Sequence, residues 1–201
     1  MQEILKKYIP EASISLVVDL LNKYPHQLKI VNQRQTKHGD FKLTKNREYQ
    51  ITINNNLNKY QFLLTLIHEI AHLVTHLNYK RVRPHGKEWK QNFQHLMLPF
   101  IHPTIYPKEI ISHLANYLKN PKASTDSDVK LALAMKQFSE KSDKQFIFEI
   151  PFGSEFIFKK RIFRRGNKRR TRYECLELKT KKLYLFNQNA EVELQLQHKY
   201  E

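Results

Sequence analysis

TLIHEIAHLV, at positions 65–74, places two histidines and a glutamate inside an apolar run that has no glycine or proline between Tyr60 and Asn78. Such a run predicts a mostly buried helix. Residues four apart share one face of a helix, so His68 and His72 can bind one metal ion together. Glu69 lies between them and can reach a water molecule at that ion. This H-E-x-x-H spacing is typical of zinc-dependent hydrolases.

A purely structural role for these residues is the simpler alternative, because H-E-x-x-H also arises by chance and a histidine on an apolar helix is often a core residue. Here, however, three ionisable side chains interrupt one apolar run. Burying such groups without partners costs free energy. The pattern therefore favours metal binding over simple packing.

The metal site requires a third ligand, and several residues are available. His76 lies two helical turns from His68, about 12 Å along the axis, whereas Zn–N bonds are only about 2.0–2.1 Å long. A ligand from a second element is therefore favoured, and His85 is the first choice. Pro84 before it predicts the start of a helix. Glu88, one turn further, is the alternative ligand.

The two motifs together, HEIAH at 68–72 and HGKEW at 85–89 after a gap of twelve residues, resemble the SprT family of zinc metallopeptidases. That family includes the Spartan proteases, which degrade proteins crosslinked to DNA. The resemblance covers about residues 28–93. It implies a zincin-like domain in which His68, His72 and His85 bind one catalytic zinc ion (Zn2+) and Glu69 is the catalytic residue.

The periodicity of the surrounding residues predicts an α+β fold. Lys37-His38-Gly39-Asp40 is expected to form a turn in which Gly39 takes a positive φ. Trp89 and Phe93 give the second motif an apolar stripe that can pack against the first helix. The expected elements are an N-terminal helix over 10–24, three strands over 27–33, 41–44 and 49–54, the two motif helices, and a helix over 107–118.

The composition divides the chain into a peptidase-like domain over 1–120, a linker with a helical segment over 121–144, and a basic β region over 145–201. Turns are expected at 153–154, 166–167 and 179–180. Some SprT relatives carry a cysteine-ligated zinc ribbon after the peptidase domain. Cys175 is the only cysteine, so this region is expected to be metal-free, as a derivative of such a ribbon would be after losing its ligands.

The net charge of +16 favours acidic partners, with nucleic acid ahead of an anionic membrane and of a merely solvated basic surface. The N-terminal residues lack the features of a signal peptide. No apolar stretch is long enough to cross a membrane. We therefore expect a cytoplasmic protein that does not bind membranes. The single cysteine fits a reducing compartment.

The strongest concentration of charge lies in a segment of the β region that contains nine basic residues and no acidic one. Basic residues with neighbouring aromatic rings favour DNA contacts without sequence specificity. The alternative is that Phe158 and Phe163 only form the core of a hairpin. The nine expected DNA-binding residues are Lys159, Lys160, Arg161, Arg164, Arg165, Lys168, Arg169, Arg170 and Arg172.

The expected function is therefore hydrolysis of peptide bonds in a protein substrate, with Glu69 removing the proton from the attacking water. By the resemblance, the substrates are proteins associated with DNA. A nucleic-acid-binding protein with a structural zinc ion is the main alternative, and it would need Glu88 or His76 as a fourth ligand. A third possibility is hydrolysis of a small amide in a narrow pocket.

Overall fold

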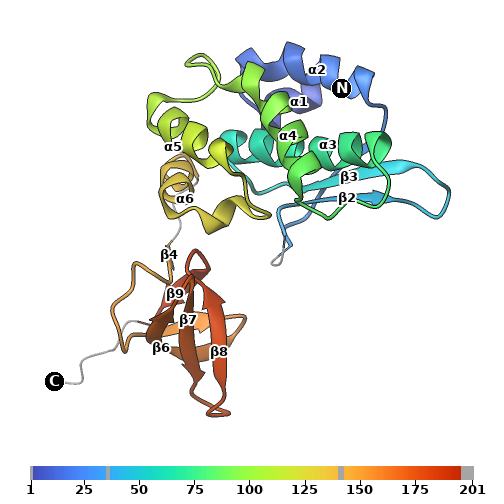
Figure 1. Cartoon of the computed structure of the whole chain (residues 1–201). Helices are drawn as coiled ribbons and strands as arrows, with labels where there is room; N and C mark the ends of the chain where they lie inside the picture. Colours follow the sequence, from blue (N-terminus) through green and yellow to red (C-terminus); the bar gives the residue numbers. More distant parts are fainter. Residues whose placement is uncertain (1, 35–36, 140–142, 196–201) are drawn as a thin grey trace. The chain divides into compact units, whose positions relative to one another are not determined.

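The computed structural model describes residues 2–34, 37–139 and 143–195, which fold into two compact units (Figure 1). The first unit contains the chain up to Thr125 together with Leu133–Ser139. The second contains Asp126–Ala132 and the residues that follow the first unit. Helix α6 (Val129–Lys136) contributes residues to both.

The first unit combines helices with a small sheet, so the predicted mixed α+β class is confirmed. Helix α1 was not predicted, because a seven-residue helix with the single buried residue Leu5 leaves almost no periodic signal. The helices are α1 (Gln2–Tyr8), α2 (Ile14–Lys23), α3 (Lys59–Asn78), α4 (Lys87–Met97) and α5 (Lys108–Lys119), with 3₁₀ turns at Glu11–Ser13 and Leu98–Phe100.

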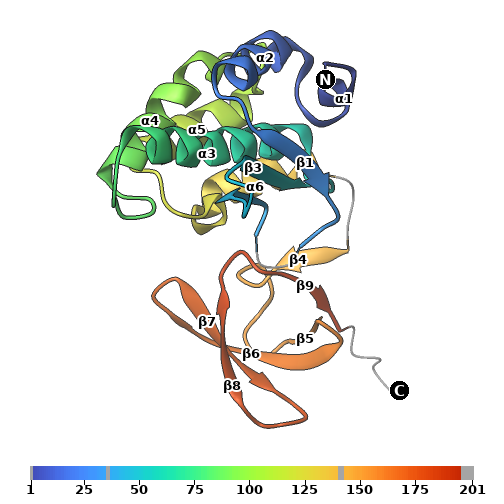
Figure 2. The same cartoon turned by 90° about the vertical axis from the view of Figure 1, so that its right-hand side faces the viewer.

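The sheet of this unit has three strands in the order β1-β3-β2, with β1 (Gln27–Val31) parallel and β2 (Gly39–Leu43) antiparallel to β3 (Tyr49–Asn54). Helix α3 lies along the sheet (Figure 2). The side chain of Arg34 donates hydrogen bonds of 2.9 Å to Thr52 Oγ1 and to Asn54 Oδ1.

The central strand β3 is buried from Gln50 to Asn54. The alternation of apolar and polar residues over 49–54 is typical of a half-buried strand, but β3 is covered on both faces. It is the central strand of the sheet, α3 packs against it, and Arg34 binds the side chains of Thr52 and Asn54. The pattern of the sequence alone could not show which strand would be central.

The turn predicted at residues 37–40 was also wrong at Gly39. This glycine begins β2, pairs with Ile53 and does not have a positive φ. Among the described glycines, only Gly153 has a positive φ, of 81°. Gly39 must therefore be explained by the space around it rather than by its backbone conformation.

The second unit is an antiparallel sheet in the order β4-β9-β5-β6-β7-β8. Strands β5 to β8 follow one another as a meander, and β9 returns to pair with β5. The inner face buries aromatic residues, among them Phe156, Phe163 and Phe186. The strands are β4 (Lys144–Phe146), β5 (Glu155–Phe158), β6 (Arg161–Arg169), β7 (Arg172–Glu177), β8 (Leu183–Asn187) and β9 (Glu191–Leu194).

The hairpin turn predicted at 166–167 was wrong, because Gly166 lies inside β6 at a bulge where the register with β7 shifts. A Cβ atom on Gly166 would lie 2.6 Å from the backbone oxygen of Glu174, so the bulge excludes a side chain there. The strand continues to Arg169, and the turn follows at Arg170, whose φ is 52°. A further turn at Lys159 and Lys160 joins β5 to β6.

None of the described helices combines the length and the apolar character that a membrane-spanning helix requires.

Candidate metal centre

Two of the three predicted ligands lie on α3, the longest helix of the first unit. Its first turn is held by Asn58, whose side chain accepts hydrogen bonds from the backbone N–H groups of Tyr60 and Gln61. Burial of its apolar face fixes the helix against the unit's core. His68 is 8% exposed, and His72 follows it one turn later on the same face.

The third predicted ligand, His85, lies in the loop before α4. The helix expected to start near Pro84 begins only at Lys87, with Gly86 as the N-cap residue. His85 itself has a φ of 57°, in the left-handed region that few residues other than glycine adopt. The backbone is thus turned sharply just where the imidazole must reach back toward α3.

The three imidazoles meet at one point. The Nε2 atom of His85 lies 2.9 Å from that of His72 and 3.2 Å from that of His68. One ligand atom from each of the three side chains lies within 4.8 Å of the other two. The structure therefore brings together all three residues that the sequence singled out as ligands.

Burial keeps these imidazoles neutral, which is the form that binds metal ions. It lowers the pKa of His72 to about 4, and the neighbouring His85 contributes to that shift. Burial likewise holds the pKa of His68 well below its ordinary value, and it lowers that of His85. Three neutral nitrogen ligands at a single point form a donor set that fits zinc.

Helix α4 holds the three histidines in place by packing against them, as predicted from the apolar stripe of Trp89 and Phe93. Both side chains are fully buried. The ring of Trp89 lies 4.6–5.3 Å from the rings of all three histidines, centroid to centroid. Phe93 stacks on Trp89 at 5.0 Å and contacts His68 at 5.5 Å.

Glu69 lies beside the histidines and is 6% exposed. Its carboxylate accepts a hydrogen bond from the backbone N–H of Phe41 in β2. Burial raises the pKa of Glu69 to about 8, and the negative charge of Asp40 adds to the shift. A carboxyl group with such a pKa can both accept and release a proton near neutral pH.

Strand β2 thus belongs to the site, although the sequence did not indicate this. The contact of Phe41 is made by its backbone, which leaves no trace in the residue type. Asp40 is close enough to influence both Glu69 and His72. The one available signal was Gly39, which we interpreted as a turn residue.

The alternative ligands are outside the group. The ring of His76 lies against Phe41 and Tyr49, at 5.8 Å and 5.7 Å between centroids. Glu88 does not join the cluster of possible ligand atoms formed by the described residues. Within the part of the chain that the structure describes, the cluster consists of His68, His72 and His85 alone.

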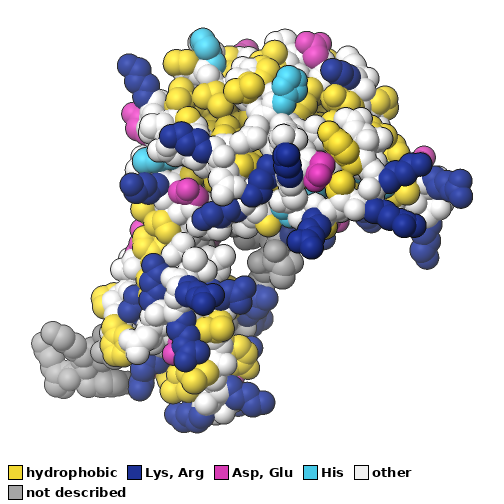
Figure 3. Space-filling model, in the orientation of Figure 1, with side chains coloured by type: hydrophobic (Ala, Val, Ile, Leu, Met, Phe, Trp, Pro, Cys, Tyr) yellow, Lys and Arg dark blue, Asp and Glu magenta, His cyan; other side chains and the backbone are white. Residues whose placement is uncertain are grey.

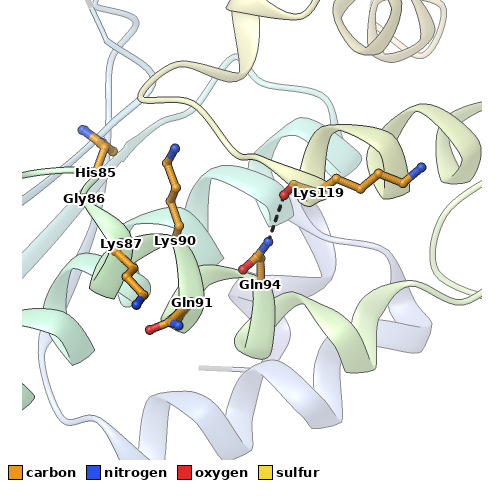
Figure 4. A pocket seen from close by; sticks show the side chains of 7 residues that line it. All are labelled: His85, Gly86, Lys87, Lys90, Gln91, Gln94 and Lys119. Atoms are coloured by element: carbon orange, nitrogen blue, oxygen red, sulfur yellow. Dashed lines mark hydrogen bonds between the residues drawn. The ribbon is translucent and has the colours of Figure 1, made fainter.

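An open hollow of about 340 Å³ lies next to His85 along α4 (Figure 4). Its lining is polar and basic, and one wall is held by Gln94, whose side chain donates to the backbone oxygen of Lys119. Approach to the histidines from this side therefore passes lysine and glutamine side chains. The lining residues are His85, Gly86, Lys87, Lys90, Gln91, Gln94 and Lys119.

The nine basic residues predicted to bind DNA are spread along β6 and the turns at its two ends. Strand β6 alone spans about 27 Å, so Lys159 and Lys160 lie at one end of it and Arg170 at the other. Basic side chains are spread over the visible face of each unit (Figure 3). Beside the β6–β7 turn lies a hollow of about 540 Å³ lined by Arg169, Arg170, Thr171, Arg172 and Leu185.

Several of the nine residues have partners inside the β unit. Arg161 pairs with Glu177 at 2.5 Å. Arg164 pairs with Glu155 at 2.8 Å, and Arg169 with Glu174 at 3.0 Å. The guanidinium group of Arg165 lies 4.3 Å from the ring centre of Tyr173. These acids lie outside the basic run in the sequence, so the run by itself does not reveal the pairing.

Comparison with known proteins identifies the region that holds the site. The profile of the SprT-like family matches residues 13–106. Protein SprT of Klebsiella pneumoniae (strain 342) is 31% identical over 97 residues, which are 46% of this chain and 54% of that protein. Protein SprT of Enterobacter sp. (strain 638) is 32% identical over 94 residues, which are 45% and 55% of the two chains.

A shorter match has higher identity: Protein SprT of Vibrio parahaemolyticus serotype O3:K6 (strain RIMD 2210633) is 70% identical over 23 residues, 11% of this chain and 14% of that protein. No solved structure matches this chain. The chain spans about half the length of the first two curated relatives. Residues 13–106, which include all three histidines and Glu69, are the part of this chain that matches the SprT-like family.

Proposed function

We propose that this protein is a zinc-dependent metallopeptidase of the SprT type with a zincin-like catalytic domain. The convergence of His68, His72 and His85 at one point, with the buried Glu69 beside them, carries the proposal. The match of residues 13–106 to the SprT-like family agrees with it. A structural role alone would not require three neutral imidazoles to face one another without an acidic partner.

His68, His72 and His85 would hold the zinc ion. When bound, zinc supplies a Lewis acid that polarises a carbonyl oxygen and lowers the pKa of water from 15.7 to about 7. The packing of Trp89 restricts the positions that the imidazoles can take. The protein thus keeps its ligands in place through the packing of α3 against α4.

Glu69 is the group that moves the proton. It accepts a proton from the water that attacks the peptide carbonyl, and then donates it to the nitrogen of the leaving amine. The raised pKa suits both steps, since the carboxylate and the carboxylic acid are both accessible near neutral pH. The N–H of Phe41 holds the side chain while the proton is transferred.

The free edge of β2 is a suitable place for an extended substrate. Asn54 N–H donates to His38 O, and Thr44 N–H donates to Glu48 O, so the even-numbered residues of this pair face β3. The backbone groups of Gly39, Phe41 and Leu43 therefore point away from β3, and of these the N–H of Phe41 is already bound to the Glu69 carboxylate. A peptide can add to such an edge through main-chain hydrogen bonds.

DNA-associated proteins are the substrates that we propose, in line with the resemblance to the Spartan proteases. The net charge of +16 supports a nucleic-acid partner. The basic β region would bind the DNA without sequence specificity, through phosphate contacts. Its cationic residues that lie near turns, such as Lys160 and Arg170, are better placed for this than Arg161, which pairs with Glu177.

The test is cleavage of casein, or of the protein itself, by the zinc-loaded enzyme with and without single-stranded DNA. Glu69→Gln should retain zinc and lose activity by about 100-fold or more, because the amide cannot accept the proton. His76→Gln, on the same helix but outside the ligand cluster, is the matched control and should remain active. Undiminished cleavage by Glu69→Gln would rule out the proposed mechanism.

A nucleic-acid-binding protein with a structural zinc ion is the second candidate function. A closed structural site uses four protein ligands. The ligand cluster of the described residues has three members, which argues against a closed site. The same assay separates the two functions, since the second predicts DNA binding and zinc binding with no cleavage by any variant.

A further inference from the structure

Gly39 lies directly against the side chain of Glu69. A Cβ atom built on Gly39 would lie 2.6 Å from Glu69 Oε1 and 2.8 Å from Glu69 Cγ. It would also lie 2.7 Å from Thr65 Cγ2, one helical turn earlier on α3. A Cβ atom essentially never approaches other atoms this closely, so even an alanine at this position must displace its neighbours.

The displacement cannot be absorbed by Thr65. Its hydroxyl donates a hydrogen bond of 2.8 Å to the backbone oxygen of Gln61, which fixes the rotamer and therefore the methyl group. Both Thr65 and Glu69 are buried on α3, the helix that meets the sheet. The side chain of Glu69 is the part that has to move.

The backbone conformation does not require a glycine at this position. Gly39 pairs with Ile53 in an ordinary antiparallel register and has no positive φ. Two residues further along the same strand, the N–H of Phe41 donates to the Glu69 carboxylate. Strand β2 thus touches this side chain at two points, by a hydrogen bond and by the bare backbone of a glycine.

We propose that Gly39 is a positioning residue for Glu69: its missing side chain lets β2 lie against the carboxylate and sets where that group stands relative to the three histidines. The kinetic consequence of this positioning rests on the proposed peptidase function. A misplacement of about 1 Å in an active site can lower the rate about 100-fold. An alanine at position 39 would cause a shift of this kind without touching any metal ligand.

The kinetic test compares Gly39→Ala with Lys42→Ala, a change in an exposed residue of the same strand. Gly39→Ala should retain the zinc content of the wild type, lower kcat by about 10- to 100-fold and leave KM within about threefold. Lys42→Ala should leave kcat and zinc content unchanged. A wild-type kcat for Gly39→Ala, or a loss of its zinc, would overturn the proposal.

A second test uses metal-free protein and does not depend on activity. Gly39→Ala should lower the Tm by several degrees in the wild-type background. In the background Thr65→Ser, Glu69→Ala, the three contact atoms are gone and the serine hydroxyl is kept, so the same change should leave the Tm unchanged or raise it. An equal fall in Tm in both backgrounds would show that Gly39 does not act through these side chains.

The two tests also separate this inference from the proposed function. If Glu69→Gln remains active, the peptidase mechanism fails. The Tm change caused by Gly39→Ala in the two backgrounds then decides by itself whether Gly39 sets the position of the Glu69 side chain. If Gly39→Ala does not fold, the variant that also carries Thr65→Ser and Glu69→Ala decides: recovery of folding supports the proposal, and failure to fold overturns it.

Discussion

Two buried glutamates, one in each unit, have pKa values shifted in opposite directions. Glu69 is 6% exposed and Glu177 is 3% exposed. Burial raises the pKa of Glu69 to about 8, whereas hydrogen bonds from Arg161 and Thr180 hold the pKa of Glu177 at about 2. The difference is a hydrogen-bonded cation: Glu177 pairs with Arg161 at 2.5 Å, whereas the charges of Arg34 and Lys37 lower the pKa of Glu69 less than burial and Asp40 raise it.

The two units use their ionisable groups in different ways. In the β unit, acids and arginines compensate one another and hold strands together. In the first unit, a buried acid, a buried imidazole and two half-buried imidazoles lie together without a hydrogen-bonded counterion, which lowers the stability of the metal-free fold. An arrangement that costs stability is typical of a functional site.

The largest effect is expected for a metal ligand. His85→Ala removes one of three converging nitrogens and should lower zinc affinity by more than about 100-fold, a greater loss than that caused by changes beside metal ligands. His76→Ala, on α3 outside the ligand cluster, should leave zinc binding unchanged. Metal analysis measures the occupancy, and the fluorescence of Trp89, the only tryptophan, should respond to binding because its ring contacts all three histidines.

Full zinc occupancy in His85→Ala would contradict this assignment of the ligands. The test would then be repeated with Glu88→Gln, because Glu88 is the alternative named from the sequence. Loss of zinc in His76→Ala together with an unfolded circular dichroism spectrum would indicate damage to α3 rather than loss of a ligand.

A smaller effect, of opposite sign in the two units, is expected for Glu69→Gln and Glu177→Gln in the metal-free protein. The pKa of Glu69 is about 8 in the folded state against an ordinary value of 4.5. Between these values the folded protein binds more protons than the unfolded chain, so this group makes stability fall as the pH rises. Glu69→Gln should therefore stabilise the protein near pH 8.5, at about 1.4 kcal/mol for each unit of pKa difference.

Glu177 has a folded pKa of about 2 against the same ordinary value of 4.5. Its contribution to stability is present above pH 4.5 and is lost as the pH falls toward 2. Glu177→Gln should thus destabilise the β unit at pH 7 and have little effect near pH 2. Urea denaturation at several pH values measures both variants, and pH profiles of the same sign would contradict the contrast.

The smallest effect is expected for the exposed basic residues. Reversing the charges of Lys168, Arg170 and Arg172 should weaken binding of single-stranded DNA and lower the slope of log K against log salt by about 0.7 for each phosphate that the protein no longer neutralises. The matched control reverses Arg161 and Glu177 together, which preserves the net charge and their pairing. An equal salt slope in both variants would exclude the β6–β7 end as the surface that binds DNA.

The sequence was sufficient for the three histidines that converge, for the mixed α+β class and for most helices of the first unit. These features depend on local spacing: residues four apart share a helical face wherever the helix lies, and the run around His68 and His72 has helical periodicity over many residues. His85 followed from the need for a ligand on a second element, and the family resemblance implied the same residue. Such signals are present in the chain before it folds.

Other features arise only when distant segments pair, and the folded structure was needed to find them. Gly39 was interpreted as a turn residue because the proximity of Glu69 depends on how β2 lies against α3. A turn was expected within the basic run at 166–167, but Gly166 lies at a bulge inside β6 and the turn follows at Arg170. Strand order, register and the partner of a buried charge are long-range properties, and residue types within one short window do not specify them.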